Sequence, residues 1–335
     1  DAAIDQIRRK NYPAKLVHGH VEWLIRHGIH RIFYPSLFYE RKEFASSDNH
    51  YNCPIVTSYS ENIRNNVESI TRGEVLLRNP FMAFTDLETV TQALVREFCD
   101  PDSRTRMEPV ASDELPSAIY GYLSQEEVTQ AAEAAWKELE KCREDIRHQG
   151  EETLRYMEEH EMKGIVLAGR PYQIDPEINH GIPEMITSYG MAVLTEDSIS
   201  HLQSPERPIT VLDQWMYHTR LYAAAAYVRT RDDLDLIQLN SFGCGIDAVT
   251  TDQVNDILSE SGKIYTCLKI DEVNNLGAAR IRVRSLIAAI RIRDQKNETR
   301  TISSTEIKKV SFTEKMREEY TILCPQMSPI HFRLL

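Results

Sequence analysis

The chain has 335 residues, of which 41% are apolar and 27% charged, and its formal net charge is −12. This length suggests two domains with adequate cores, and no apolar run is long enough to span a membrane. The negative charge argues against a nucleic-acid binder. Six scattered cysteines without a CxxC pair predict neither a zinc finger nor a disulfide framework, so we expect a protein of the reducing cytoplasm.

The first part of the chain alternates predicted strands with predicted helices. The pattern indicates helices over residues 13–27, 61–70 and 86–98, and strands over residues 29–34, 53–59 and 75–77. This alternation is typical of a parallel sheet with helices on its faces. We therefore predict a first α/β lobe over residues 1–115, ending in a polar segment without clear periodicity.

A long helical pattern begins after residue 123. Ser124 and Glu127 have the spacing of a capping box, and an apolar seam continues to about residue 161. The predicted seam comprises Val128, Ala132, Ala135, Leu139, Cys142, Ile146, Leu154 and Met157. We predict that this helix, within residues 116–163, links two lobes. Cys99, Cys142 and Cys267 are predicted to be structural, with Cys142 buried on the seam.

The strand–helix alternation resumes in a second predicted lobe over residues 164–293. Strands are predicted over residues 164–168, 191–194, 234–239 and 263–269, and helices over residues 182–188, 211–228 and 276–293. The predicted fold is α/β, with two flavodoxin- or Rossmann-like lobes that have parallel sheets and are joined by the long helix. Residues 294–335 are predicted to be a linker and the start of a further segment, as expected for a central fragment of a longer protein.

The stretch most suggestive of chemistry is the glycine-rich turn around Cys244. It lies between the predicted strand 234–239 and a helix that Thr250 and Gln253 could cap. Backbone amides and a helix N-terminus favour a thiolate, and ligands of open α/β sheets bind beyond the carboxyl ends of strands. A small structural cysteine is an equally good interpretation.

Three further stretches, residues 34–36, 59–62 and 169–172, stand at predicted carboxyl ends of strands and should line one crevice with Cys244. After the last of them, a proline-containing loop presents Arg170, Asn179 and His180 together. His180 is either an acid–base group or a cap of the following helix. Neither GxxxxGK[ST] nor GxGxxG occurs, so the sequence gives no support for nucleotide hydrolysis by this chain.

Four segments carry a family resemblance. They are NYPAKLVHGH at 11–20, NHYNCPIVTSY at 49–59, GRPY with DPEINHGI within 169–182, and NSFGCGIDAVTTDQ at 240–253. In this order they resemble the large 2-hydroxyacyl-CoA dehydratase-related proteins, which join activase-like ATPase domains to a dehydratase-like iron–sulfur component. The resemblance implies an iron–sulfur cluster held by Cys53 and Cys244, electrons from an ATP-driven activator, and an acyl-CoA or similar small substrate.

The sequence departs from this family pattern at Asn11 and Ser36, which stand where the family has cysteine and which we expect to line the same pocket as Cys53 and Cys244. Neither side chain replaces a thiolate well at iron. Either other domains or a second subunit supply the missing ligands, or the chain is a non-catalytic scaffold that docks a partner. The oligomeric state is open, with a homo-oligomer as one option. A third hypothesis makes Cys244 a nucleophile paired with His18 or His180.

Overall fold

The computed structural model describes residues 12–99, 123–207, 209–211, 213–241, 244–270, 276–296 and 313–319. Asn11 and the polar segment after residue 99 lie outside the described residues. The chain divides into two compact units, residues 1–302 and 303–335. The second unit contains the described helix α15 (Met316–Glu319), and all other described elements belong to the first unit.

The first lobe is built on a parallel ribbon of strands that two prolines interrupt. Its strands form the pairs β1–β3 and β2–β4: β1 (Arg31–Phe33), β2 (Ser36–Tyr39), β3 (Leu76–Arg78) and β4 (Phe81–Ala83). The Tyr34 N–H donates to the Arg78 carbonyl at 2.8 Å, and the Ser36 N–H donates to the Pro80 carbonyl at 2.9 Å. These bonds continue the ladder past Pro35 and Pro80, which lack the N–H group that an unbroken ladder needs.

The described helices of this lobe are α2 (Tyr12–Arg26), α3 (Pro54–Thr57), α4 (Tyr59–Asn66), α5 (Glu68–Thr71) and α6 (Leu87–Cys99). The small core of the lobe forms where Val21 of α2 packs against Ile63 of α4 and Val67. The lobe therefore depends on few buried side chains, in contrast to the second lobe.

The predicted strand over residues 53–59 is wrong, because this segment forms α3 and the start of α4. Pro54 occupies the first turn of α3, a position that its fixed φ and missing N–H suit. The Thr57 hydroxyl donates to the Leu37 carbonyl at 2.7 Å and to the Cys53 carbonyl at 3.1 Å, which ties the helix to β2. The apolar run that suggested a strand thus begins a short helix that is hydrogen-bonded to β2.

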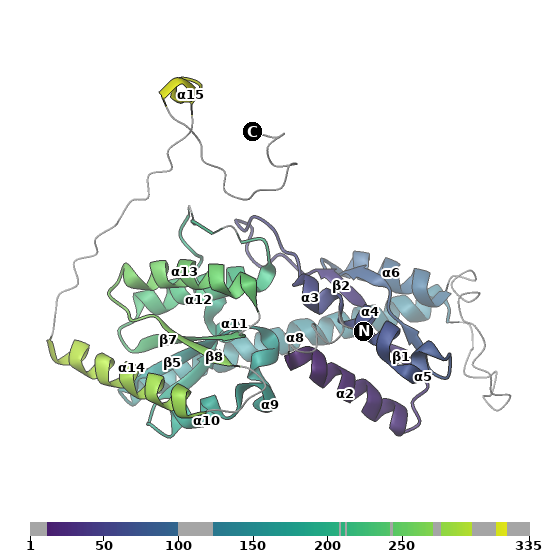
Figure 1. Ribbon diagram of the computed structural model, residues 1–335, viewed down its shortest axis with the longest axis horizontal. Helices are drawn as coiled ribbons and strands as arrows, with labels where there is room; N and C mark the ends of the chain where they lie inside the picture. The colour runs from purple at the N-terminus through teal and green to yellow at the C-terminus, as the bar shows by residue number, and fades with distance from the viewer. Residues whose placement is uncertain are drawn as a thin grey trace. The chain divides into compact units, whose positions relative to one another are not determined.

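The long helix α8 (Gln125–Glu159) links the lobes and begins with the predicted capping box between Ser124 and Glu127 (Figure 1). The predicted seam is buried only toward its ends. Cys142 is exposed, which corrects the prediction that it lies in a core. In the middle of the helix, Trp136 and Glu140 face the first lobe instead: the Trp136 ring lies 5.6 Å from Phe84, and Glu140 pairs with Arg41 at 2.5 Å.

The second lobe contains one parallel sheet in the order β6-β5-β7-β8. Its strands are β5 (Gly164–Ala168), β6 (Ala192–Thr195), β7 (Leu234–Ser241) and β8 (Thr266–Ile270). Counted within the lobe, this is the order 2-1-3-4 of flavodoxin-like folds. The connection changes direction between β5 and β7, so the carboxyl ends of these two strands flank the switch point where such folds bind ligands.

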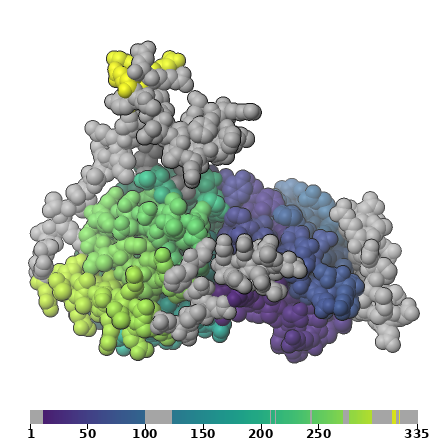
Figure 2. All heavy atoms as spheres, in the orientation of Figure 1, coloured from purple at the N-terminus to yellow at the C-terminus, as the bar shows by residue number. Residues whose placement is uncertain are grey.

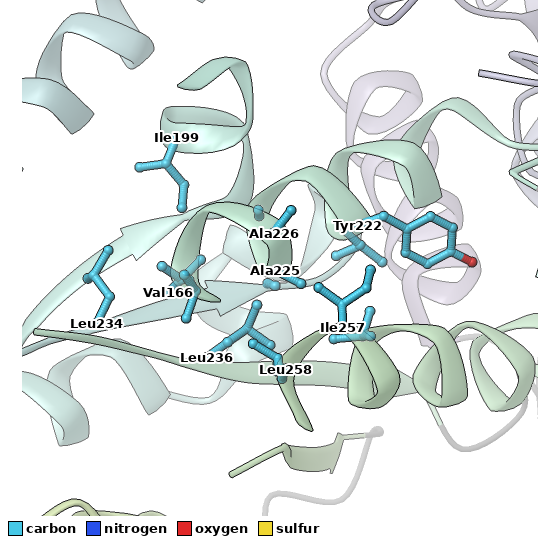
Figure 3. Close-up of a cluster of buried hydrophobic side chains, with 14 of the residues drawn as sticks. Val166, Ile199, Tyr222, Ala225, Ala226, Leu234, Leu236, Ile257 and Leu258 are labelled. Carbon is cyan, nitrogen blue, oxygen red and sulfur yellow. The ribbon is translucent and has the colours of Figure 1, made fainter. Parts of the chain in front are cut away.

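Helices cover both faces of this sheet: η2 (Pro171–Ile174), α9 (Pro176–Asn179), α10 (Ile182–Thr187), α11 (Glu196–Ile199), η3 (Ser200–Leu202), α12 (Met216–Thr230), α13 (Gly245–Ser259) and α14 (Leu276–Lys296). On one face, Val166 of β5 and Leu236 of β7 pack against Tyr222 of α12 and Leu258 of α13 (Figure 3). On the other face, α10 and α14 bury the alternate residues of the same strands.

The predicted α/β fold with parallel sheets and a long helix is confirmed. The proposed domain boundaries remain predictions. The helix after Cys244 begins at Gly245 rather than near Thr250, so the expected capping box is wrong. The Gln253 side chain instead accepts hydrogen bonds from the backbone of Thr210 and Val211, at 2.6 and 2.9 Å. Among the described residues, no helix combines the length and the apolar character that crossing a bilayer requires.

Candidate functional site between the two lobes

The segment before Cys53 belongs to the first lobe in sequence but is hydrogen-bonded to the second. The Asn49 N–H donates to the Asp213 carbonyl at 3.2 Å, and the Tyr51 N–H donates to the Gln214 carbonyl at 3.1 Å. The Met216 N–H returns a bond to the Tyr51 carbonyl at 3.2 Å. Figure 2 shows the first lobe, in purple and blue, beside the second lobe in green. These bonds hold Cys53 at the junction of the lobes, and α12 begins at the last of them, with Met216.

A cleft of about 330 Å³ lies at this junction. The first lobe contributes Tyr34, Cys53 and Tyr59 to its lining, and the second lobe contributes Arg170, Tyr172 and Tyr217. Three of the stretches that the sequence analysis placed at strand ends thus supply residues to one cleft. Its size lies within the range of small-molecule sites, which are mostly apolar with a few polar groups. Burial raises the pKa of Tyr172 to about 12 against the opposing Arg170, so this phenol stays protonated at neutral pH.

Arg170 connects the cleft to the Cys244 turn. It follows β5, and its Nε and Nη2 atoms donate to Asp247 Oδ1 at 3.2 and 2.8 Å. Both side chains of this ion pair are only 4% exposed. Arg170 Nη2 also lies 3.6 Å from Cys244 Sγ. Burial alone would lower the pKa of Arg170, but the Asp247 carboxylate outweighs it and holds the pKa above its usual value.

The expectation that the turn favours a Cys244 thiolate is wrong. Cys244 is the N-cap residue of α13, but its side chain makes no capping hydrogen bond. Burial raises the pKa of the thiol, the neighbouring Asp247 carboxylate raises it further, and Arg170 only partly opposes both effects. At neutral pH Cys244 is therefore a thiol.

Alkylation by iodoacetamide should distinguish the cysteines. We expect Cys142, which is exposed, to react first at neutral pH. Cys244 should react slowly until the pH approaches the raised pKa of its thiol, because the thiolate is the reacting form. Mass spectrometry of peptides sampled over time at several pH values would measure both rates. Equal rates for Cys142 and Cys244 at neutral pH would contradict the raised pKa.

The imidazole of His218 is buried near Arg170. His218 of α12 is 1% exposed, and neither ring nitrogen has a hydrogen-bond partner among the described residues. Burial, aided by the nearby Arg170, lowers the pKa of His218 well below its usual value, so the ring is neutral at physiological pH. The Oδ2 atom of Asp247 is also without a partner in this part of the chain. These atoms can bind water or a ligand group next to the ion pair.

The structure does not gather all predicted site residues at the cleft. Ser36 is 1% exposed, and its hydroxyl lies 2.6 Å from that of Ser60 within the first lobe. The Asn179 amide bonds its own loop, to the Ile174 carbonyl at 3.1 Å and from the Gly181 N–H at 3.0 Å. His180 ends α9 with a positive φ of 55° and stacks on Tyr12, with ring centroids 6.3 Å apart. Asn11 lies outside the described residues.

The sequence analysis did not identify Asp247, Tyr217 or His218 as site residues. Asp247 could have been identified from the sequence. It is an acidic residue in the first turn of α13, the helix after β7, and β7 pairs with β5, the strand that Arg170 follows. Tyr217 and His218 could not have been identified in this way, because nothing in the sequence of the predicted helix 211–228 indicated that one of its faces contacts the first lobe. Their roles follow from the pairing of residues 48–51 with residues 213–216.

The described residues do not provide a complete ligand set for an iron–sulfur cluster. Clusters of this kind are held by four cysteine thiolates. Cys53 lines the cleft and Cys244 contacts Arg170, but the described part of the chain has no group of three or more His, Cys, Asp or Glu side chains placed to hold a metal. A cluster at this site would need ligands from other residues or from a second subunit.

Comparisons with known proteins identify the family. No curated protein and no solved structure matches the chain. Residues 5–199, more than half of the 335 residues, match the family model described as the CoA enzyme activase uncharacterised domain. The match includes all described elements of the first lobe, α8, and the second lobe as far as α11, with Cys53 and Arg170 inside it. The chain therefore belongs to this CoA enzyme activase family.

Proposed function

We propose that the chain is a dehydratase-related component of a CoA-enzyme activation system. In this role the cleft binds the acyl group of an acyl-CoA or a similar small substrate, and electrons come from an ATP-driven activator. The family supports a role tied to CoA-enzyme activation. The observation that carries the proposal further is the meeting of Cys53 from one lobe with Arg170 and Tyr172 from the other in one cleft.

The lining of the cleft suits a ligand with an apolar body and an oxygen-bearing end. Val56, Ile178 and the tyrosine rings supply apolar surface. Arg170 supplies a guanidinium group that Asp247 holds in a fixed orientation, and such a group can donate hydrogen bonds to a carbonyl or carboxylate oxygen. An apolar, enclosed setting strengthens these bonds because it keeps water away.

Binding of acetyl-CoA, measured by calorimetry on protein purified without oxygen, tests the cleft. Val56 and Ile55 are neighbours on α3, but Val56 lines the cleft whereas Ile55 is 42% exposed. Val56→Trp should fill the cleft and weaken binding by at least about tenfold, which corresponds to 1.4 kcal/mol. Ile55→Trp, the matched control, should bind as the unmodified protein does. Equal binding by the two variants would refute the assignment of the cleft.

The iron–sulfur hypothesis is tested separately. It retains Cys53 and Cys244 as two ligands and takes the others from outside the described residues. After anaerobic reconstitution, Cys53→Ser and Cys244→Ser should each lower iron and sulfide per chain, and Cys142→Ser should leave both unchanged. Unchanged iron in the first two variants would remove these cysteines from the ligand set.

One observation favours the alternative of a non-catalytic, partner-docking scaffold. Ser36, at a family cysteine position, is buried against Ser60 and does not line the cleft. A scaffold would retain no iron after reconstitution and would show no binding of acetyl-CoA, and it would still associate with the activator.

A further inference from the structure

A buried carboxyl group lies immediately behind the cleft. Glu40 follows β2, is 6% exposed and does not itself line the cleft. Its Oε1 atom is 3.3 Å from Asn52 Nδ2 and 3.4 Å from the Tyr217 hydroxyl. Asn52 and Tyr217 both line the cleft, so each can contact Glu40 on one side and a ligand on the other.

Tyr217 is held in place from the second lobe. The Arg220 guanidinium lies over its ring, 5.0 Å from the centroid. Arg220 is itself fixed by Glu196 at 2.8 Å and approaches Glu43 at 3.8 Å. Asn52 is held from the first lobe, where its Oδ1 accepts the Cys53 N–H at 2.8 Å. Glu40 is thus in contact with cleft residues from both lobes, and one of them adjoins Cys53.

The charges around Glu40 are mixed. Burial raises the pKa of its carboxyl group. Arg143 of α8, the Tyr217 hydroxyl and Arg220 of α12 oppose this rise, Glu43 adds to it, and the pKa remains above its usual value. Glu40 therefore keeps its proton to higher pH in the folded protein than in the unfolded chain, and its protonated form adds to the stability of the fold. This contribution to stability is gained as the pH falls through the raised pKa and lost as the pH rises through it.

We propose that Glu40 and Tyr217 form a proton-sharing pair that presents a hydrogen-bond donor to an oxygen atom of the ligand in the cleft. This inference rests on the proposed function and names a partner for the ligand's acyl oxygen. When Glu40 is protonated, its O–H donates to the Tyr217 oxygen, and the phenol O–H points into the cleft. When Glu40 is ionised, Tyr217 donates to its Oε1 atom instead, across the same 3.4 Å contact.

The pair can also transfer a proton without transferring electrons. As negative charge develops on a ligand oxygen, the Tyr217 O–H bond breaks and a new O–H bond forms on the ligand. The Glu40 O–H bond breaks as its proton moves to the Tyr217 oxygen. Glu40 becomes a carboxylate, which the Asn52 amide and the re-formed Tyr217 hydroxyl stabilise by hydrogen bonds. Such positioned donors are a common source of acid catalysis.

Infrared difference spectroscopy on the full chain, without ligand, tests the pair itself. A protonated carboxyl band should persist to higher pH than for ordinary glutamates. It should vanish in Glu40→Gln and shift in Tyr217→Phe. Tyr227→Phe is the control, because Tyr227 lies on the same helix, outside the cleft lining. Loss of the band at the pH of exposed glutamates, or a band unaffected by Tyr217→Phe, would overturn the proposal.

A second measurement uses acetyl-CoA labelled with carbon-13 at the thioester carbonyl. On binding, the carbonyl band should move to lower frequency, and Tyr217→Phe, measured at acetyl-CoA concentrations that saturate the variant, should show a smaller shift. An unchanged shift in Tyr217→Phe would overturn the role of the pair. Failure of the unmodified protein to bind acetyl-CoA would refute the proposed function, and the ligand half of this inference with it. The carboxyl band would then still decide whether Glu40 and Tyr217 share a proton.

Discussion

Replacing Asp247 by alanine is expected to destabilise the second lobe by about 3–5 kcal/mol, because it leaves the Arg170 guanidinium buried without a counter-charge. The Arg170 side chain is 4% exposed, and Asp247 accepts two of its hydrogen bonds. The thiol of Cys244, a further polar contact of the guanidinium, is a weak acceptor and carries no charge at neutral pH. Urea unfolding followed by circular dichroism would measure the change in the free energy of unfolding.

Two controls separate this effect from a general loss of charge pairs. Arg170→Met combined with Asp247→Leu should recover most of the lost stability, because it removes both buried charges together. Glu68→Ala breaks the pair with Arg72 on the surface, where the side chains are 72% and 62% exposed. It should change the free energy of unfolding by no more than about 1 kcal/mol. A similar effect from Asp247→Ala and Glu68→Ala would show that the Arg170 pair is not desolvated.

The second lobe could be predicted well because its two central strands, β5 and β7, are buried on both faces. β5 contains only apolar residues and glycine, and the predicted strand has the same ends as the observed one. β7 was predicted from Leu234 onward, although it continues two residues beyond the predicted end at Leu239. The continuous apolar run of β5 is informative in this setting, since a two-sided core demands it.

Sequence patterns gave wrong predictions where a segment was short and its side chains bond residues far away in the sequence. Residues 53–59 contain an apolar run, but Pro54 and the bond from Thr57 to Leu37 fit a helix. The spacing of Thr250 and Gln253 matched a capping box, yet Gln253 bonds the backbone of residues 210 and 211. Sequence spacing reveals local partners, whereas these side chains use partners contributed by distant segments.

Prediction of the candidate site met the same limit. Arg170 was identifiable because it follows a clear strand, but its partner Asp247 lies 77 residues away. Asn179 and His180 are close enough to Arg170 in sequence to suggest a shared site. In the structure, however, the Asn179 side chain bonds its own loop and His180 ends α9. Cys53 is held next to the second lobe by the backbone hydrogen bonds of Asn49 and Tyr51, which no side-chain pattern indicates.

Gly150→Ala should destabilise the protein by about 1–3 kcal/mol, the usual cost of overpacking. Gly150 lies within α8 where that helix packs against α11. An added Cβ would lie 2.4 Å from the carbonyl oxygen of Ser198 and 2.8 Å from its Cβ. The carbonyl belongs to the backbone, so the two helices would have to separate.

The sign of this effect is what makes the prediction informative. A glycine inside a helix is ordinarily less favourable than alanine by about 0.5–1 kcal/mol, so the substitution would stabilise a helix without close neighbours. Gly19 provides the matched control, because it lies inside α2 and an added Cβ would meet nothing within 4 Å. Gly19→Ala should therefore raise the melting temperature, and Gly150→Ala should lower it. If both variants gain stability, α8 and α11 do not make the close contact that fastens the linking helix to the second lobe.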